Sequence, residues 1–128
     1  MEVKFYYCKT CGNLLIPAVD VSVFPICCGE IMDLLVPGQT DAAVEKHVPV
    51  VVREDDGKHV EVKVGEVAHP MVDEHYIQFV VLAHGPRFYY HKFSPGDEPA
   101  ARFAIKDNSM PLAAYEFCNL HGLWKAEV

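Results

Sequence analysis

Residues 115–124 read Tyr-Glu-Phe-Cys-Asn-Leu-His-Gly-Leu-Trp, and the rest of the sequence is organised around this stretch. It brings a thiol, Cys118, and an imidazole, His121, together in one turn of the chain. A soft sulfur and a borderline nitrogen at that spacing can bind one transition metal. The stretch therefore predicts a metal site whose other ligands come from elsewhere in the sequence.

Three more histidines complete a set of candidate ligands: His47, His69 and His75. Taken alone, each would fit an ordinary surface or core position, and only the set indicates a metal. Four imidazoles and one thiolate leave one octahedral position free for a substrate, which suits iron better than closed tetrahedral zinc. The remaining histidines lie outside these motifs, and we expect no role for them: His59, His84 and His91.

The first 36 residues contain four cysteines in two pairs, each pair followed by glycine: Cys8, Cys11, Cys27 and Cys28. This pattern is a strong metal signature, and a segment so short needs a metal or a disulfide to stay folded. Because neighbouring side chains on a strand point to opposite faces, Cys27 and Cys28 can reach one metal only if the chain kinks there. Zinc and iron both suit four sulfurs. Two disulfides are disfavoured in a reducing compartment.

Residues 36–41 (Val-Pro-Gly-Gln-Thr-Asp) are typical of a linker, so we expect two domains, residues 1–36 and 37–128. A helical turn capped by Thr40 or Asp41 is expected over residues 41–46. Short strands are predicted over residues 48–52, 60–64, 76–83, 87–93, 101–106 and 113–117. This spacing, without a long helix, predicts a mainly β second domain, an antiparallel β-sandwich or barrel of immunoglobulin-like type.

The formal net charge of −7 argues against a nucleic-acid partner, which requires a basic surface. Acidity would also repel a small anionic substrate, so anion chemistry would need a local positive charge. Lys46, next to His47, is the candidate. No apolar run approaches the roughly 20 residues that span a bilayer, and the N-terminal residues do not resemble a signal peptide, so we expect a cytoplasmic protein with no membrane partner.

These motifs resemble those of the two-iron superoxide reductases of the desulfoferrodoxin type, over essentially the whole length. Cys8-x-x-Cys11 and Cys27-Cys28 resemble the desulforedoxin-like iron site of the family's small N-terminal domain. The motifs of the catalytic domain resemble Glu45-Lys46-His47-Val48-Pro49, His69-Pro70-Met71, His75 and Cys118-Asn119-Leu120-His121-Gly122. The departure is a longer hairpin region at residues 55–59, which lies between motifs.

The resemblance implies a role for each matching residue. The histidines His47, His69, His75 and His121 would form an equatorial plane around iron, with Cys118 axial. Glu45 would occupy the sixth position in the ferric state, and Lys46 would attract superoxide and help to deliver a proton through water. The implied product is hydrogen peroxide.

The resemblance also implies partners: rubredoxin or a similar small carrier as electron donor, and a homodimer paired through the first domains. The apolar residues 14–16 and 19–26 are consistent with such a contact, and equally with packing inside the domain.

Two alternatives from other functional classes stay open at this point. A rubredoxin-like electron carrier would use only the cysteine site and leave the four histidines and Cys118 unexplained. A zinc-stabilised binding module would contain stoichiometric zinc and show no colour.

Overall fold

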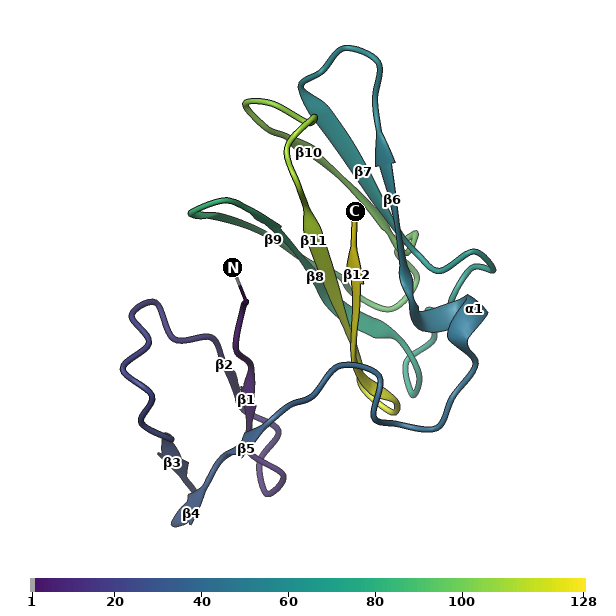
Figure 1. Cartoon of the computed structure of the whole chain (residues 1–128). Coiled ribbons are helices and arrows are strands. Elements are labelled where there is room, and N and C mark those ends of the chain that lie inside the picture. The colour runs from purple at the N-terminus through teal and green to yellow at the C-terminus, as the bar shows by residue number, and fades with distance from the viewer. Residues whose placement is uncertain (1) are drawn as a thin grey trace. The chain divides into compact units, whose positions relative to one another are not determined.

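The computed structural model describes residues 2–128 and consists mainly of short antiparallel strands (Figure 1). It divides into two compact units, the first ending at Val36 and the second running Pro37–Val128. Among the described residues, no helix has the length and hydropathy to cross a membrane. The mainly β fold predicted from the sequence is confirmed.

The first unit holds five strands of two residues each: β1 Tyr6–Tyr7, β2 Leu14–Leu15, β3 Ile26–Cys27, β4 Glu30–Ile31 and β5 Asp33–Leu34. They form a three-stranded sheet in the order β2-β1-β5 and a β3-β4 hairpin. One buried cluster of this unit consists of Tyr6, Cys8 and Met32, with Cys27 packed against it. A unit of this length buries too little apolar surface to stay folded without a metal or a disulfide, so we expect its cysteines to contribute to its stability.

The second unit holds seven strands: β6 Pro49–Arg53, β7 His59–Val64, β8 Ile77–His84, β9 Arg87–Lys92, β10 Ala100–Ala104, β11 Ala113–Cys118 and β12 Gly122–Glu127. They form two antiparallel sheets, in the orders β10-β7-β6 and β12-β11-β8-β9. The two sheets pack face to face, as the sequence predicted.

Alternation along the strands builds the core between these sheets. Val60, Val62 and Val64 of β7 are all at most 1% exposed, while the residues between them face outward. Across the core they meet Val80 and Leu82 of β8. This period of two is what the valine pattern of residues 60–64 predicted.

A β-bulge interrupts the pairing of β8 with β11 beside the metal-binding turn. Phe117 pairs with Phe79, but Cys118 pairs with Ile77, so Gln78 is the extra residue. As a result Ile77 and Val80, three positions apart, both face the core. The bulge therefore sets the direction of the chain where β11 delivers Cys118.

The helix of this unit differs from its prediction. α1 spans Val44–His47 and begins after Ala43, which has an extended backbone and no side-chain cap. The predicted cap by Thr40 or Asp41 is therefore wrong. A single turn is too short to be set by local propensity, and here the His47 ring, whose Nδ1 lies 2.7 Å from the Ala43 carbonyl oxygen, closes it instead.

The sequence also missed one whole strand, because β12 follows the Cys118–Gly122 turn directly and its residues do not alternate clearly in hydropathy. The five two-residue strands of the first unit carry no readable period either.

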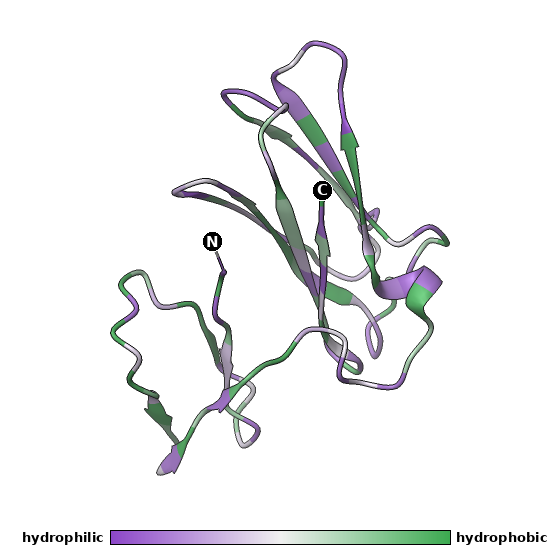
Figure 2. Ribbon diagram, in the orientation of Figure 1, coloured by the Kyte–Doolittle hydropathy of each residue, from purple (hydrophilic) through white to green (hydrophobic). Residues whose placement is uncertain are grey.

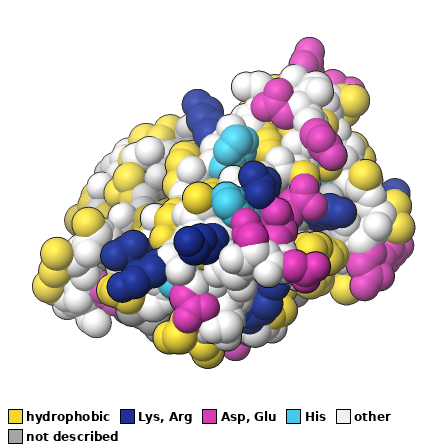
Figure 3. Space-filling view, turned by 90° about the horizontal axis from the view of Figure 1, so that it is seen from above, with side chains coloured by type: hydrophobic (Ala, Val, Ile, Leu, Met, Phe, Trp, Pro, Cys, Tyr) yellow, Lys and Arg dark blue, Asp and Glu magenta, His cyan; other side chains and the backbone are white. Residues whose placement is uncertain are grey.

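Figure 2 shows hydrophobic and hydrophilic colour alternating along β7, and mainly hydrophilic colour at the hairpin between β6 and β7. On the face drawn in Figure 3, basic, acidic and hydrophobic side chains are interspersed. That face therefore carries no continuous basic surface of the kind that nucleic acid requires.

Gly65 gives the first testable prediction. A Cβ atom there would lie 2.5 Å from the Glu45 carbonyl oxygen and 2.8 Å from the Lys46 carbonyl carbon, because Gly65 packs directly against the backbone of α1. We expect Gly65→Ala to lower the free energy of unfolding by about 1–3 kcal/mol, the usual effect of overpacking. Urea denaturation measures this change, and an unaltered midpoint would show that α1 moves aside freely.

Candidate metal centres

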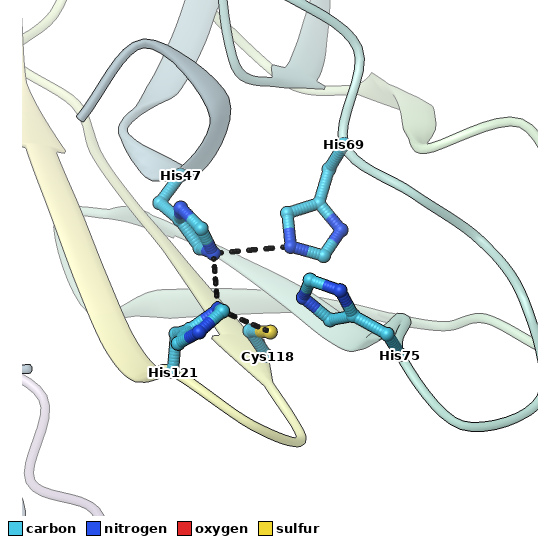
Figure 4. Close-up of side chains that lie close together, drawn as sticks. All are labelled: His47, His69, His75, Cys118 and His121. Carbon is cyan, nitrogen blue, oxygen red and sulfur yellow. Dashed lines mark hydrogen bonds between the residues drawn. The ribbon is translucent and has the colours of Figure 1, made fainter. Parts of the chain in front are cut away.

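Four histidine rings and one thiol converge in the second unit (Figure 4). One ligand atom from each residue lies within 4.8 Å of every other: His47, His69, His75, Cys118 and His121. These residues come from α1, from the segment between β7 and β8, and from the end of β11 with the turn that follows. The structure thus brings together all five residues that the sequence predicted for this centre.

The turn between β11 and β12 places two of the five. Cys118 pairs with Gly122 across the hairpin, so Asn119, Leu120 and His121 form a three-residue loop. Gly122 has a φ of 77°, the left-handed conformation that ends such loops and that glycine adopts freely. The short loop leaves the sulfur of Cys118 and the ring of His121 on the same side, with Sγ 3.9 Å from Nδ1.

The segment between β7 and β8 supplies two more ligand candidates. The His69 N–H donates to the Val64 carbonyl oxygen at the end of β7, which ties the residue to the sheet. His75 pairs with Val72 through two backbone hydrogen bonds of 3.1 Å, so the chain turns back before β8 begins. Both rings therefore project from anchored backbone.

The four rings are arranged around a common centre. Neighbouring rings meet at nearly right angles, between 79° and 87°, with centroids 4.6–5.0 Å apart in the order His47, His69, His75, His121. His47 and His75 face each other across the centre at 6.5 Å and are tilted by only 26°. Four rings in this arrangement can direct one nitrogen each to a single ion.

Hydrogen bonding fixes which nitrogens point inward. Nδ1 of His47 lies 2.7 Å from the Ala43 carbonyl oxygen, and Nδ1 of His69 lies 2.7 Å from the Pro70 carbonyl oxygen. A carbonyl only accepts, so each Nδ1 carries the proton and each neutral ring presents an unprotonated Nε2. Those two Nε2 atoms lie 3.1 Å apart, with both lone pairs directed at the centre.

This spacing fits a shared metal. Two nitrogens bound at about 2.1 Å and at right angles lie about 3.0 Å apart. Nε2 of His47 lies 3.1 Å from Nε2 of His69 and 3.1 Å from Nδ1 of His121. Nε2 of His75 is buried with no hydrogen-bond partner among residues 2–128. A bound cation would satisfy all of these nitrogens at once.

Burial keeps the imidazoles neutral. It lowers the pKa of His69 to about 4 and also lowers the pKa values of His47 and His75. The positive charge of Lys46 lowers the pKa values of His47 and His75 as well, as a smaller cause than burial. Burial raises the pKa of Cys118, so a metal that binds its thiolate must displace a proton.

Neither of the two residues predicted to act beside the metal is among the converging atoms. Lys46 and Glu45 are exposed on α1, immediately before His47. Glu45 lines a groove together with Val44, Val48 and Glu66. Both residues are thus free to reach solvent next to the centre.

Trp124 packs against two of the segments that carry ligand candidates. Its Nε1–H donates to the His121 carbonyl oxygen at 3.0 Å, and its indole stacks on the His47 ring with centroids 5.1 Å apart.

Glu116, two residues before Cys118, was missed by the sequence analysis. It is fully buried, and neither carboxyl oxygen has a hydrogen-bond partner among the described residues. Burial raises its pKa well above the ordinary value, so the carboxyl stays neutral. The sequence did contain an indication of this buried carboxyl, because Glu116 is the one acidic residue in the otherwise apolar strand β11.

The four cysteines of the first unit form the second converging group, with all sulfurs within 4.8 Å of one another. Four sulfurs about 2.3 Å from a tetrahedral metal lie about 3.8 Å apart. Sγ of Cys27 lies 3.6 Å from that of Cys11 and 4.0 Å from that of Cys28. The expected kink is present, because Cys28 and Gly29 both have positive φ values, 53° and 75°.

Backbone amides point at these sulfurs. The Cys11 amide lowers the pKa of Cys8 to about 7, and the Asn13 N–H donates to Cys11 Sγ at 3.4 Å. Hydrogen bonding with the Cys11 sulfur is the main cause that raises the pKa of Cys28 to about 12. Cys8 therefore loses its proton easily and Cys28 does not, so a metal that binds all four sulfurs must displace the protons that remain.

A third group combines His59 with Glu54 and Asp56 in the β6–β7 hairpin. Both carboxylates already have partners: Arg102 binds Glu54 through two hydrogen bonds of 2.7 and 2.9 Å, and Asp56 pairs with His59. This group stabilises the hairpin.

The chain is similar in sequence and in fold to known proteins over most of its length. A family model described as Desulfoferrodoxin matches residues 39–127. A desulfoferrodoxin of Syntrophotalea carbinolica is 43% identical, over 98% of this chain and 97% of the relative. A superoxide reductase of Pyrococcus horikoshii is 41% identical, over 66% of this chain and 86% of the relative. The crystal structure of the superoxide reductase from Treponema pallidum matches with a TM-score of 0.79 and 34% identity, over 98% of this chain and 97% of that chain.

The lowered histidine pKa values predict how the metal-free protein responds to pH. The unfolded chain titrates these rings near pH 6.5 and the folded chain titrates them lower, His69 at about 4. Between those values the unfolded state binds more protons, so the free energy of unfolding falls as the pH is lowered from about 6.5 to about 4.

His69→Gln should flatten this fall. Urea titrations of the metal-free protein across the window measure it, and the same slope in wild type and variant would contradict the assignment.

Proposed function

This chain belongs to the desulfoferrodoxin family, and we propose that it reduces superoxide to hydrogen peroxide at an iron held by four histidines and one cysteine. The proposed ligands are the converging residues His47, His69, His75, His121 and Cys118. One observation carries the proposal: two neutral imidazoles present unprotonated Nε2 atoms to each other at 3.1 Å. Two lone pairs that close repel unless a cation lies between them.

The ligand set selects the chemistry. Five ligands leave one of six octahedral positions for a substrate, whereas structural zinc takes four ligands and closes its site. An iron(II) held by these residues would supply the one electron that superoxide takes up, and its charge would stabilise the negative charge of the reduced product. One electron and two protons convert superoxide to hydrogen peroxide, with the O–O bond retained.

Cys118 is the proposed ligand that tunes the metal. A thiolate pushes electron density toward the opposite ligand. Burial raises the pKa of its thiol, and the nearby backbone N–H groups of Leu120 and His121 lower that pKa, which favours the thiolate form. The short turn that carries Cys118 therefore provides both the ligand and its hydrogen-bond donors.

Lys46 is the proposed residue that attracts superoxide and relays a proton through water. It is exposed on α1 immediately before His47, where its ammonium can meet an approaching anion. The chain as a whole carries a net charge of −7, so a local cation is needed to draw in an anion. Glu45, its neighbour on α1, is the proposed sixth ligand in the ferric state, when no substrate is present.

The four cysteines of the first unit are the proposed ligands of a second iron. Their sulfur spacing fits a tetrahedral metal, and a unit this short generally needs a metal or a disulfide to stay folded. This iron stabilises the unit. An electron carrier that used this site alone would leave the five-ligand centre without a role.

Each turnover consumes one electron, so the enzyme needs a donor. We propose a small one-electron carrier such as rubredoxin. A cytoplasmic location suits the five cysteines, which are all unpaired in the structure.

A homodimer formed through the first unit is proposed from its exposed apolar side chains: Val19, Val21, Val23, Ile26 and Ile31. Apolar side chains gathered on so small a unit favour burial against a second copy. Sedimentation equilibrium should give about twice the chain mass of 14.3 kDa, and a monomer at all concentrations would contradict this.

The ligand assignment predicts a contrast between two histidines. His75→Ala should abolish superoxide reduction, because it removes a metal ligand, while His91→Ala should retain it, because His91 is exposed on β9 outside the cluster. Stopped-flow consumption of superoxide measures both variants. Full activity in His75→Ala, or equal loss in both, would refute the assignment.

The role of Lys46 predicts a change in association rate. Lys46→Ala should slow the second-order capture of superoxide by about 10-fold or more and weaken its dependence on salt, because steering by the ammonium is lost. Lys46→Arg keeps the charge and serves as the matched control. Pulse radiolysis measures both rates, and an unchanged rate in Lys46→Ala would count against steering.

A further inference from the structure

Asn119 connects the two loops that carry four of the five proposed iron ligands. It follows Cys118 and precedes His121 by two positions, in the three-residue turn between β11 and β12. The loop before β8, which carries His69 and His75, lies against that turn. Three hydrogen bonds join the loop and the turn, and all three involve Asn119.

The side-chain amide makes two of these bonds in opposite directions. Its Oδ1 accepts from the Tyr76 N–H at 2.9 Å, and its Nδ2–H donates to the Glu74 carbonyl oxygen at 3.1 Å. The backbone N–H of Asn119 donates to the Tyr76 carbonyl oxygen at 3.2 Å. The amide thus grips the backbone on both sides of His75.

This grip requires an amide of this length. A side chain that both accepts and donates is needed, and a carboxylate would only accept. The position of Asn119 in the chain is equally important for this role. Its two side-chain partners, Glu74 and Tyr76, lie on either side of His75. Asn119 itself lies one residue after Cys118 and two residues before His121. A shift of either loop would therefore move ligand atoms on both sides of the iron.

We infer that Asn119 is a positioning residue for the iron, which fixes the distance between the Cys118–His121 turn and the His75 loop. This inference rests on the proposed five-ligand site. Asn119 does not touch the metal or the substrate. It acts by tying the turn that carries Cys118 and His121 to the loop that carries His75, as residues that support metal ligands commonly do.

A second asparagine in the same unit provides a matched control. Nδ2 of Asn108 donates to the Glu54 and His59 carbonyl oxygens at 2.7 and 2.9 Å, and the residue is buried. It too clamps backbone with its amide, but at the His59 end of β7, whereas the loop to the ligands leaves from the Val64 end. Loss of Asn108 tests the general effect of removing a buried amide clamp.

The test uses the full-length, iron-loaded protein. Asn119→Ala and Asn108→Ala are compared with wild type by the rate of iron release to a chelator, by the thiolate-to-iron(III) charge-transfer band of the five-ligand centre, and by urea unfolding. The four-cysteine iron of the same molecule is the internal reference, because its own absorption reports separately.

Asn119→Ala should release the five-ligand iron at least about 10-fold faster than wild type and shift the charge-transfer band, while the four-cysteine iron is retained. Asn108→Ala should lower the unfolding free energy and leave both the release rate and the band unchanged. Asn119→Asp keeps the acceptor for the Tyr76 N–H and loses only the donor toward Glu74, so it should release iron at an intermediate rate; it carries the test if Asn119→Ala does not fold.

Wild-type release and an unshifted band in the Asn119 variants would overturn the inference while leaving the five-ligand site intact. Equal acceleration in Asn108→Ala would also overturn it, because the effect would then follow general stability. A wild-type protein without the charge-transfer band would overturn the proposed function and the inference together.

Discussion

The second unit depends on an electrostatic constraint at its centre: several imidazole lone pairs are directed at one point. Carbonyl oxygens of Ala43 and Pro70 hold the protons of His47 and His69 on the outer nitrogens, which leaves both inner nitrogens unprotonated and 3.1 Å apart. Protonation could relieve the repulsion, but burial disfavours the charged rings. A metal cation at that point would relieve the repulsion without charging the rings.

The β-sandwich supplies rigid supports for this constraint and keeps the ligands themselves on short connections. Cys118 is the last residue of β11 and lies beside a bulge. The backbone N–H of His69 donates a hydrogen bond to the carbonyl oxygen of Val64, the last residue of β7. His47 closes the single turn of α1, against which Gly65 packs. Ligands at strand ends can be aimed freely, while the paired strands behind them restrict their movement.

The sequence revealed the chemistry more completely than the backbone. The nine ligand candidates could be found because cysteines and histidines at short spacing, such as Cys118 and His121, indicate a metal site from the sequence itself. The alternating valines of β7 likewise predicted a strand. The start of α1 and the strand β12 could not be found, since tertiary contacts and a three-residue turn set them rather than local propensity. The bulge at Gln78 depends on pairing between strands that lie about 40 residues apart in the sequence, so no local pattern predicts it. The burial of Glu116 could not be predicted either, because glutamate is normally an exposed residue.

The decisive measurement is the metal content of the protein. We expect about two irons per chain and no zinc in protein purified without oxygen from iron-supplied cells, one iron for each converging group. One iron with one zinc would leave the five-ligand centre intact and give the four cysteines a purely structural metal. Zinc alone would contradict the account, because an ion without redox chemistry cannot reduce superoxide, and the chain would then be a zinc-stabilised binding module.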